Sequence, residues 1–397
     1  MNDIINYIIR FLSYDNEKVA SLIGYTADKD DWKNYKVVVI PNGLLGQRIE
    51  LPKEDAFEPR YTVEKGKIIF QTDIIYNAFF FLSSAEETIQ PKRDAHQRFV
   101  AKYSILGTGE RLQTPIVDVY ANLIYQLLEV PFPKPKLQKI WLTHDVDTIT
   151  FYHSLRGFLG GISRGQWSEA ISSVLDFHHD PAFSFDWIAQ EDSKIAAQPV
   201  YFIKKTKGEG YDYPQYGYNG KIYQYLLQLW KKNNAILGWH SSYYLQNKFP
   251  KKLTLPFVED NVFYHRSHFL RCNISVLDYL ANAGNEQNVQ IHDFSIGFAD
   301  KAGFRLQTTR PVRWINPNNY QLTNLMLHPL HMMDVTLSEP HYMNLKYPQA
   351  LALAKQIIET VEKYNGELCL LFHNSSFVPS TYHTILYSML IHFLQNK

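Results

Sequence analysis

Short apolar runs alternate with amphipathic stretches along residues 137–397, and this alternation restricts the fold to a few architectures. Strands that alternate with helices imply a parallel sheet, either closed into a barrel or left open. In both architectures functional side chains collect at the carboxyl ends of the strands. The runs that we predict to be strands are 139–143, 200–204, 235–239, 261–266, 289–294, 327–335 and 367–372.

A proline-rich stretch divides the chain. Its sequence, VPFPKPK at 130–136, has prolines at alternate positions, which favour extended backbone and stop a helix from crossing. A chain of 397 residues is long enough for two domains. We therefore expect a smaller mixed α/β domain of unknown role at 1–130, a linker at 131–136 and a second domain at 137–397. In the first domain the pattern predicts strands at 36–41 and 67–71 and helices at 74–87 and 117–128.

Charge and hydropathy exclude several classes of protein. The net charge is +1, from 40 basic and 39 acidic side chains without long like-charge blocks, so we expect no nucleic-acid partner. Residues 1–14 have helical spacing and no cleavage site, which favours a packed amphipathic helix over a signal peptide. No apolar window reaches the ~18 residues of a membrane span. Cys272 and Cys369 lie in apolar runs and predict free core thiols, and we expect a cytoplasmic protein.

Charged and metal-binding side chains follow several predicted strands. Asp145 and Asp147 come directly after strand 139–143, and residues two apart in extended backbone point to the same side. Two carboxylates that face one site repel each other unless a cation or a shared proton lies between them. His240 ends the strand at 235–239.

The remaining strand ends add three more such groups. Arg266 and His268 are again two apart, and His373 ends the strand at 367–372. One such residue alone is more often a helix cap or a structural hydrogen-bonding group. Their recurrence at equivalent strand ends indicates one functional site.

The order of these motifs resembles NodB-type polysaccharide deacetylases of carbohydrate esterase family four. The resemblance covers roughly residues 137–397 and implies a distorted (β/α)7 barrel. The segments that carry it are THDVD at 143–147, GWHSSY at 238–243, HRSHFLR at 265–271, GFR at 303–305, MMDVTL at 332–337 and LFHNSSF at 371–377. The N-terminal region, with FFFLSSAEE at 79–87 and TPIVDVY at 114–120, is similar to the uncharacterised domain that precedes such deacetylases.

The resemblance also implies an activity, hydrolytic N-deacetylation of an N-acetylated sugar in a glycan. It implies one divalent metal, zinc by its ligand chemistry, with Asp147 and His240 as ligands. The roles that it assigns to other positions are a general base at Asp145, a general acid at His373, an arginine at Arg266 that orients the base, and an oxyanion-binding backbone N–H near Phe269.

One position departs from the family pattern of His-Ser/Thr-x-x-His. Tyr244 stands four residues after His240, so the third metal ligand is missing there. Either the metal site is lost or another residue supplies the ligand. We favour His268, because the other reacting groups are retained and it lies on the same side of its strand as Arg266.

Four further residues are candidates for substrate binding or support, and Tyr244 itself is one of them. Asp334, and with less weight Asp293, could orient Arg266 or contact sugar hydroxyls, because a carboxylate in an apolar run needs a partner. Arg305 could bind substrate or form a surface salt bridge. Two other classes of function stay open: a non-catalytic glycan-binding relative with an incomplete metal site, and a metal-dependent amidase that acts on a non-sugar amide. The sequence does not determine the oligomeric state.

Overall fold

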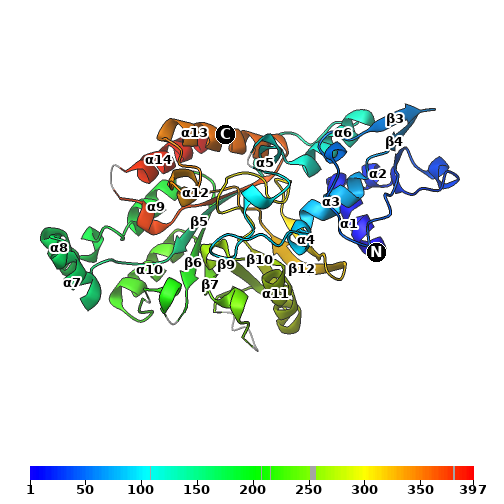
Figure 1. Ribbon diagram of the computed structural model, residues 1–397. Coiled ribbons are helices and arrows are strands. Elements are labelled where there is room, and N and C mark those ends of the chain that lie inside the picture. Colours follow the sequence, from blue (N-terminus) through cyan, green and yellow to red (C-terminus); the bar gives the residue numbers. More distant parts are fainter. Residues whose placement is uncertain (108, 207, 215, 251–255, 379–380) are drawn as a thin grey trace.

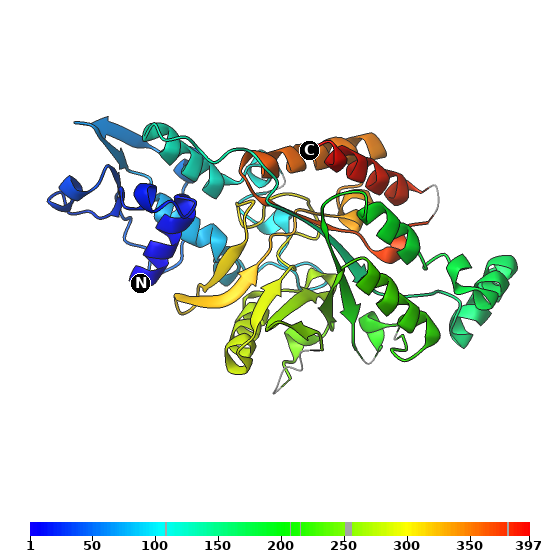
Figure 2. The same ribbon diagram turned by 180° about the vertical axis from the view of Figure 1, so that it is seen from behind.

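Figures 1 and 2 show a computed structural model that describes residues 1–397 apart from 108, 207, 215, 251–255 and 379–380. Its strands form two separate sheets, one of four strands and one of ten. Helices and strands are mixed in both parts of the chain, which confirms the expected α/β class.

The smaller sheet has the order β1 (Ile23–Tyr25), β2 (Val37–Val39), β4 (Lys67–Phe70) and β3 (Tyr61–Glu64). The first three strands are parallel, and β3 pairs with β4 in the antiparallel sense. The helices of this region are α1 (Asn2–Leu12), α2 (Glu17–Ala20), α3 (Ile74–Leu82), α4 (Glu86–Ile89), α5 (Glu110–Gln113) and α6 (Ile116–Leu127). The helix predicted at 74–87 is interrupted after Leu82, because Ser84 has a left-handed backbone, with φ of 58°.

The larger sheet has the order β11-β12-β10-β9-β7-β6-β5-β14-β13, with β8 added beside β9. All neighbours from β12 to β13 are parallel, as the alternation of strands and helices predicted. The strands are β5 (Lys139–Val146), β6 (Gln198–Lys204), β7 (Ile236–Ser241), β8 (Val258–Glu259), β9 (Val262–Ser267), β10 (Gln290–Asp293), β11 (Val312–Asn316), β12 (Gln321–Leu327), β13 (Met332–Met333) and β14 (Glu367–Leu371).

The sheet is curled into a half-barrel (Figure 1). Its end strands β11 and β13 are not paired with each other in the described chain. The single strand predicted at 327–335 is wrong. This run contains the end of β12, an irregular segment, the two-residue β13 and the start of helix α12 (Asp334–Ser338).

Alternate residues of the parallel strands face two different cores. Leu142 and Leu370 pack on the helical side, against the helices α9 (Phe185–Asp192), α10 (Lys221–Lys232), α13 (Tyr347–Lys363) and α14 (Tyr382–Gln395). Trp141, Phe202 and Phe294 pack on the inner side of the curl. Helix α11 (Ile274–Gln287) covers the sheet near β10 and β12, and α7 (Leu155–Ser163) and α8 (Trp167–Leu175) form a hairpin that projects from the body (Figure 1).

The two sheets share no strand, but the regions that hold them share a hydrophobic core. Ile4 and Ile8 of α1 belong to the same buried cluster as Trp314 of β11 and Leu325 of β12. A buried carboxylate adds polar contacts, since Asp118 of α6 accepts hydrogen bonds from residues 308–310. The residues 131–136 between the regions form neither helix nor strand.

Both cysteines are free and buried, as predicted from their apolar surroundings. Within the described residues, no helix has the length and apolar character needed to cross a membrane.

Candidate metal centre

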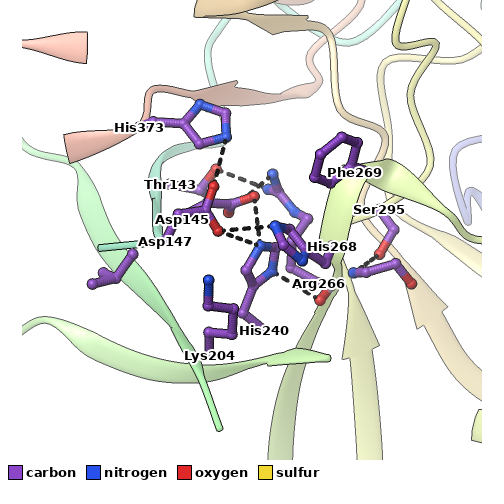
Figure 3. A network of polar contacts seen from close by, with 12 residues as sticks. Thr143, Asp145, Asp147, Lys204, His240, Arg266, His268, Phe269, Ser295 and His373 are labelled. Atoms are coloured by element: carbon purple, nitrogen blue, oxygen red, sulfur yellow. Dashed lines mark hydrogen bonds and ion pairs between the residues drawn. The ribbon is translucent and has the colours of Figure 1, made fainter. Parts of the chain in front are cut away.

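Neighbouring strands bring polar side chains to one end of the half-barrel (Figure 3). The strands β9, β7, β6, β5 and β14 are adjacent and parallel, so their carboxyl ends meet. The structure brings together all six residues of the predicted constellation. They are Asp145 and Asp147 at the end of β5, His240 in β7, Arg266 and His268 from β9 and the turn after it, and His373 after β14.

Three of these side chains form a group that could hold a metal ion. One potential ligand atom from each of Asp147, His240 and His268 lies within 4.8 Å of the other two. Asp147 Oδ1 is 3.4 Å from His240 Nε2 and 3.2 Å from His268 Nε2. Both histidines are buried and Asp147 is half-buried, so the group opens to solvent on the carboxylate side.

The imidazole rings are oriented by contacts on their far sides. His240 Nδ1 donates to the carbonyl oxygen of Arg266 at 3.2 Å, and His268 Nδ1 donates to Asp212 Oδ1 at 2.9 Å. In the neutral imidazoles both Nε2 atoms therefore carry the lone pair, and they face Asp147. His240 Nε2 and Asp147 Oδ1 are buried and have no hydrogen-bond partner among the described residues. Buried acceptors without donors fit a cation, and the outer contacts are those that metal-binding histidines usually make.

The ionisation of the group agrees with this geometry. Burial alone would raise the pKa of Asp147, but the neighbouring imidazoles of His240 and His268 outweigh it and hold that pKa well below the usual range. Burial lowers the pKa of His240. Burial also opposes the charge on His268, yet its contacts with Asp147 and Asp212 raise the pKa. Asp147 is thus an anion, as a metal ligand must be.

Asp145 lies beside this group and has different partners. Its Oδ1 is 3.5 Å from Arg266 Nη1, and its Oδ2 is 3.5 Å from His240 Nε2. Arg266 is fully buried, donates to Thr143 Oγ1 at 2.8 Å and lies over the ring of Phe202 at 4.9 Å. The arginine therefore neutralises Asp145 and fixes its position.

His373 lies on the opposite side of Asp147, with Nε2 3.8 Å from Asp147 Oδ2. Its Nδ1 donates to Asp334 Oδ1 and its backbone N–H to Asp334 Oδ2, both at 2.8 Å. Burial opposes the charge on His373, but the carboxylate of Asp334 raises the pKa of the imidazole to about 10. His373, rather than Arg266, is thus the partner of Asp334.

Other predicted residues lie outside the triad. Asp293 accepts from His265 Nδ1 at 2.6 Å and so supports β9 rather than Arg266. Arg305, predicted either to bind substrate or to form a surface salt bridge, forms a salt bridge with Glu87 that is buried. Tyr244 is 41% exposed, and its hydroxyl accepts the backbone N–H of Tyr211 at 3.5 Å.

Phe269 follows His268 in the turn after β9. Its backbone is left-handed, with φ of 59°, and its ring centroid lies 4.9 Å from that of His268 (Figure 3). A non-glycine residue in this conformation needs support from its surroundings. Arg98, a residue of the N-terminal region, donates to the Phe269 carbonyl oxygen at 3.1 Å.

Two residues of the site were missed in the sequence. Lys204 ends β6 beside His240, and its Nζ is buried without a hydrogen-bond partner in the part of the chain that the structure describes. Its position at the end of the predicted strand 200–204 could have identified it as a residue of the site. Asp212 lies in the loop after β6, where no pattern distinguished it. Burial opposes its charge, but hydrogen bonds from His268 and Ser242 lower its pKa overall.

Comparison with known proteins adds one match. The sequence profile of a family of unknown function, DUF7033, matches residues 2–133, which comprise the four-stranded sheet and helices α1–α6. No curated protein and no solved structure matches the chain.

Proposed function

We propose that the chain is a metal-dependent hydrolase that removes the acetyl group from an N-acetylated sugar of a polysaccharide or glycan precursor. The observation that carries this proposal is that Asp147, His240 and His268 lie beside one candidate base, Asp145, and one candidate acid, His373. Asp145 is paired with an arginine, and His373 is paired with a carboxylate. A base, an acid and a cation site side by side are what hydrolysis of an amide requires.

On this proposal residues 137–397 are a distorted (β/α)7 deacetylase barrel of the NodB type. The curled parallel sheet and the site at its carboxyl ends support the assignment. The third ligand is His268 in place of a histidine at position 244, which the distance of 3.2 Å from Asp147 Oδ1 to His268 Nε2 supports.

Zinc is the ion that we assign, because one carboxylate oxygen and two imidazole nitrogens suit it and leave a position open. When bound, it would lower the pKa of a water molecule and polarise the acetyl carbonyl group. Asp145 accepts the proton of the attacking water, and Arg266 keeps this base oriented. The backbone N–H near Phe269 binds the developing oxyanion. His373 protonates the departing nitrogen as the C–N bond breaks, and acetate and an amine are released.

The charge states support this division of roles. His373 carries a raised pKa, of about 10, and is therefore protonated at neutral pH, as a general acid must be before the reaction. Asp145 has its free oxygen on the side of the triad, because the other oxygen faces Arg266. A carboxylate held in this way can take up a proton without leaving its place.

The test is acetate release by the zinc-loaded chain from N-acetylglucosamine oligomers, with a simple acetanilide as the comparison substrate. We expect turnover of the oligomers and loss of that turnover in Asp145→Asn. Turnover of the anilide alone would indicate a non-sugar amidase. Zinc binding without hydrolysis of either substrate would indicate a non-catalytic relative.

A further inference from the structure

A cluster of aromatic rings lies at the rim of the candidate metal centre, and four separate segments of the chain build it. Tyr211 and Tyr243 have ring centroids 4.3 Å apart. Phe269 lies 5.5 Å from Tyr211 and 5.3 Å from Tyr243. The fourth ring is His96, which belongs to the N-terminal region and lies 4.9 Å from Phe269 and 5.5 Å from Tyr211. We name these four residues the aromatic platform.

Polar contacts hold the N-terminal loop against this rim. His96 Nδ1 is 3.1 Å from the hydroxyl of Tyr243, and Gln246 Nε2 donates to the carbonyl oxygen of Gln97 at 3.2 Å. Arg98 is buried, is paired with Asp94 and also holds the carbonyl oxygen of Phe269. These contacts therefore fix residues 94–98 in place as part of the rim.

The aromatic platform is continuous with the metal-binding group. Asp212 Oδ1 accepts both His268 Nδ1, at 2.9 Å, and the backbone N–H of Tyr243, at 2.8 Å. The ring of Phe269 lies 4.9 Å from that of His268. A ligand at the triad would therefore have the aromatic platform next to it.

One ring of the aromatic platform is open to solvent. Tyr211 is 51% exposed and the neighbouring Tyr244 is 41% exposed, whereas His96 and Phe269 are half-buried and Tyr243 is buried. A cavity of about 550 Å³ adjoins the loop, and its lining includes His96, Arg98, Lys102, Lys301, Glu339 and Tyr342. An exposed aromatic ring with hydrogen-bonding groups beside it matches a sugar ring, which has apolar C–H faces and a polar edge. Binding of this rim to a lipid surface would be unfavourable, because charged side chains of both signs surround it.

We propose that the aromatic platform is a second sugar-binding subsite, which stacks the pyranose ring next to the ring whose acetyl group lies at the triad. The proposal rests on the proposed function and extends it to an oligosaccharide substrate. It also gives the region matched by the family of unknown function a role, because His96 comes from that region and Arg98 of the same loop fixes the turn of Phe269.

The test compares N-acetylglucosamine with its tetramer. In Tyr211→Ala and in His96→Ala we expect the ratio of kcat/KM for the tetramer to that for the monomer to fall about tenfold, the effect of one lost aromatic contact. Tyr211→Phe keeps the ring and should therefore keep the native ratio. Tyr61→Ala is the matched control, since Tyr61 is 39% exposed on β3 of the other sheet, and it should leave the ratio as it is.

Calorimetric titration with the tetramer provides a readout that does not need turnover. Binding by the native chain that weakens in Tyr211→Ala and in His96→Ala supports the subsite, even if no acetate is released and the proposed function fails. Equal binding by native and variant chains would overturn it. The absence of tetramer binding by the native chain would overturn it as well. Zinc affinity, measured in parallel, should be the same in all these variants, because none of the exchanged residues belongs to the triad.

Discussion

Asp212 accepts a hydrogen bond from His268 Nδ1 at 2.9 Å, and this contact decides which nitrogen of the imidazole faces Asp147. A carboxylate can only accept, so Nδ1 carries a proton, and in the neutral imidazole the lone pair of His268 is on Nε2. The nitrogen that points to Asp147 is therefore the one that can bind a metal.

The ligand set can be tested by removing one imidazole at a time. We expect His268→Ala and His240→Ala to weaken zinc binding to a similar extent, by more than the 10- to 100-fold that loss of an outer contact costs. Tyr244→Phe should bind zinc like the native chain, because Tyr244 is exposed and contacts Tyr211. Competition titration with a chelator measures all three. Native zinc affinity in His268→Ala would contradict the assignment.

Asp212 should act on zinc binding through His268. Asp212→Asn keeps the shape of the side chain and removes its charge, and we expect zinc to bind about tenfold more weakly. The matched control is Asp186→Asn, an exchange at a half-exposed carboxylate that accepts from Tyr225. The prediction is wrong if the two variants bind zinc equally well.

Asp145 and His373 should affect turnover rather than metal binding. In Asp145→Asn and in His373→Gln we expect the rate of deacetylation to fall by about 10²- to 10⁴-fold, the usual contribution of a general base or acid. Atomic absorption of the dialysed proteins should still find zinc in both. If Asp145→Asn instead loses the metal, the roles of Asp145 and Asp147 are exchanged.

The dyad of His373 and Asp334 predicts a dependence of stability on pH. Folding raises the pKa of His373 from 6.5 to about 10, so its stabilising contribution is complete below pH 6.5 and is lost as the pH rises through about 10. For the metal-free chain we expect this loss to amount to roughly 5 kcal/mol of unfolding free energy. Urea denaturation of the native chain and of His373→Gln measures it. Identical pH profiles of the two proteins would contradict the prediction.

We expect Lys204 to lower the affinity of the candidate metal centre for zinc. Its buried ammonium group has no hydrogen-bond partner in the described chain, and burial lowers its pKa although Asp147 and Asp212 oppose this. Because a neighbouring positive charge repels a divalent cation, Lys204→Met should bind zinc about tenfold more tightly. Lys205→Met, an exchange at the exposed neighbour, is the control. Weaker zinc binding in Lys204→Met would show that the ammonium group supports the site.

The strand-end residues could be predicted because side-chain direction in a strand depends only on local backbone. The inward direction of Asp145 in β5, and the common side of Arg266 in β9 and His268 just after it, follow from a period of two residues. The parallel order of the strands followed from the helices between them. The break of the run 327–335 into the end of β12, an irregular segment, β13 and the start of α12 was not predictable, because a continuous apolar run does not reveal where the backbone leaves the sheet.

The partners of these residues were decided by tertiary structure. Asp212 and His268 are 56 positions apart, and His373 and Asp334 are 39 apart, so their contacts depend on the paths of intervening loops. The contact of Arg98 with Phe269 spans 171 positions and requires the packing of the N-terminal region on the half-barrel. Local sequence patterns specify which way a side chain leaves its strand. Which group it meets is settled by the hydrophobic core that fixes the loops and the two regions in place.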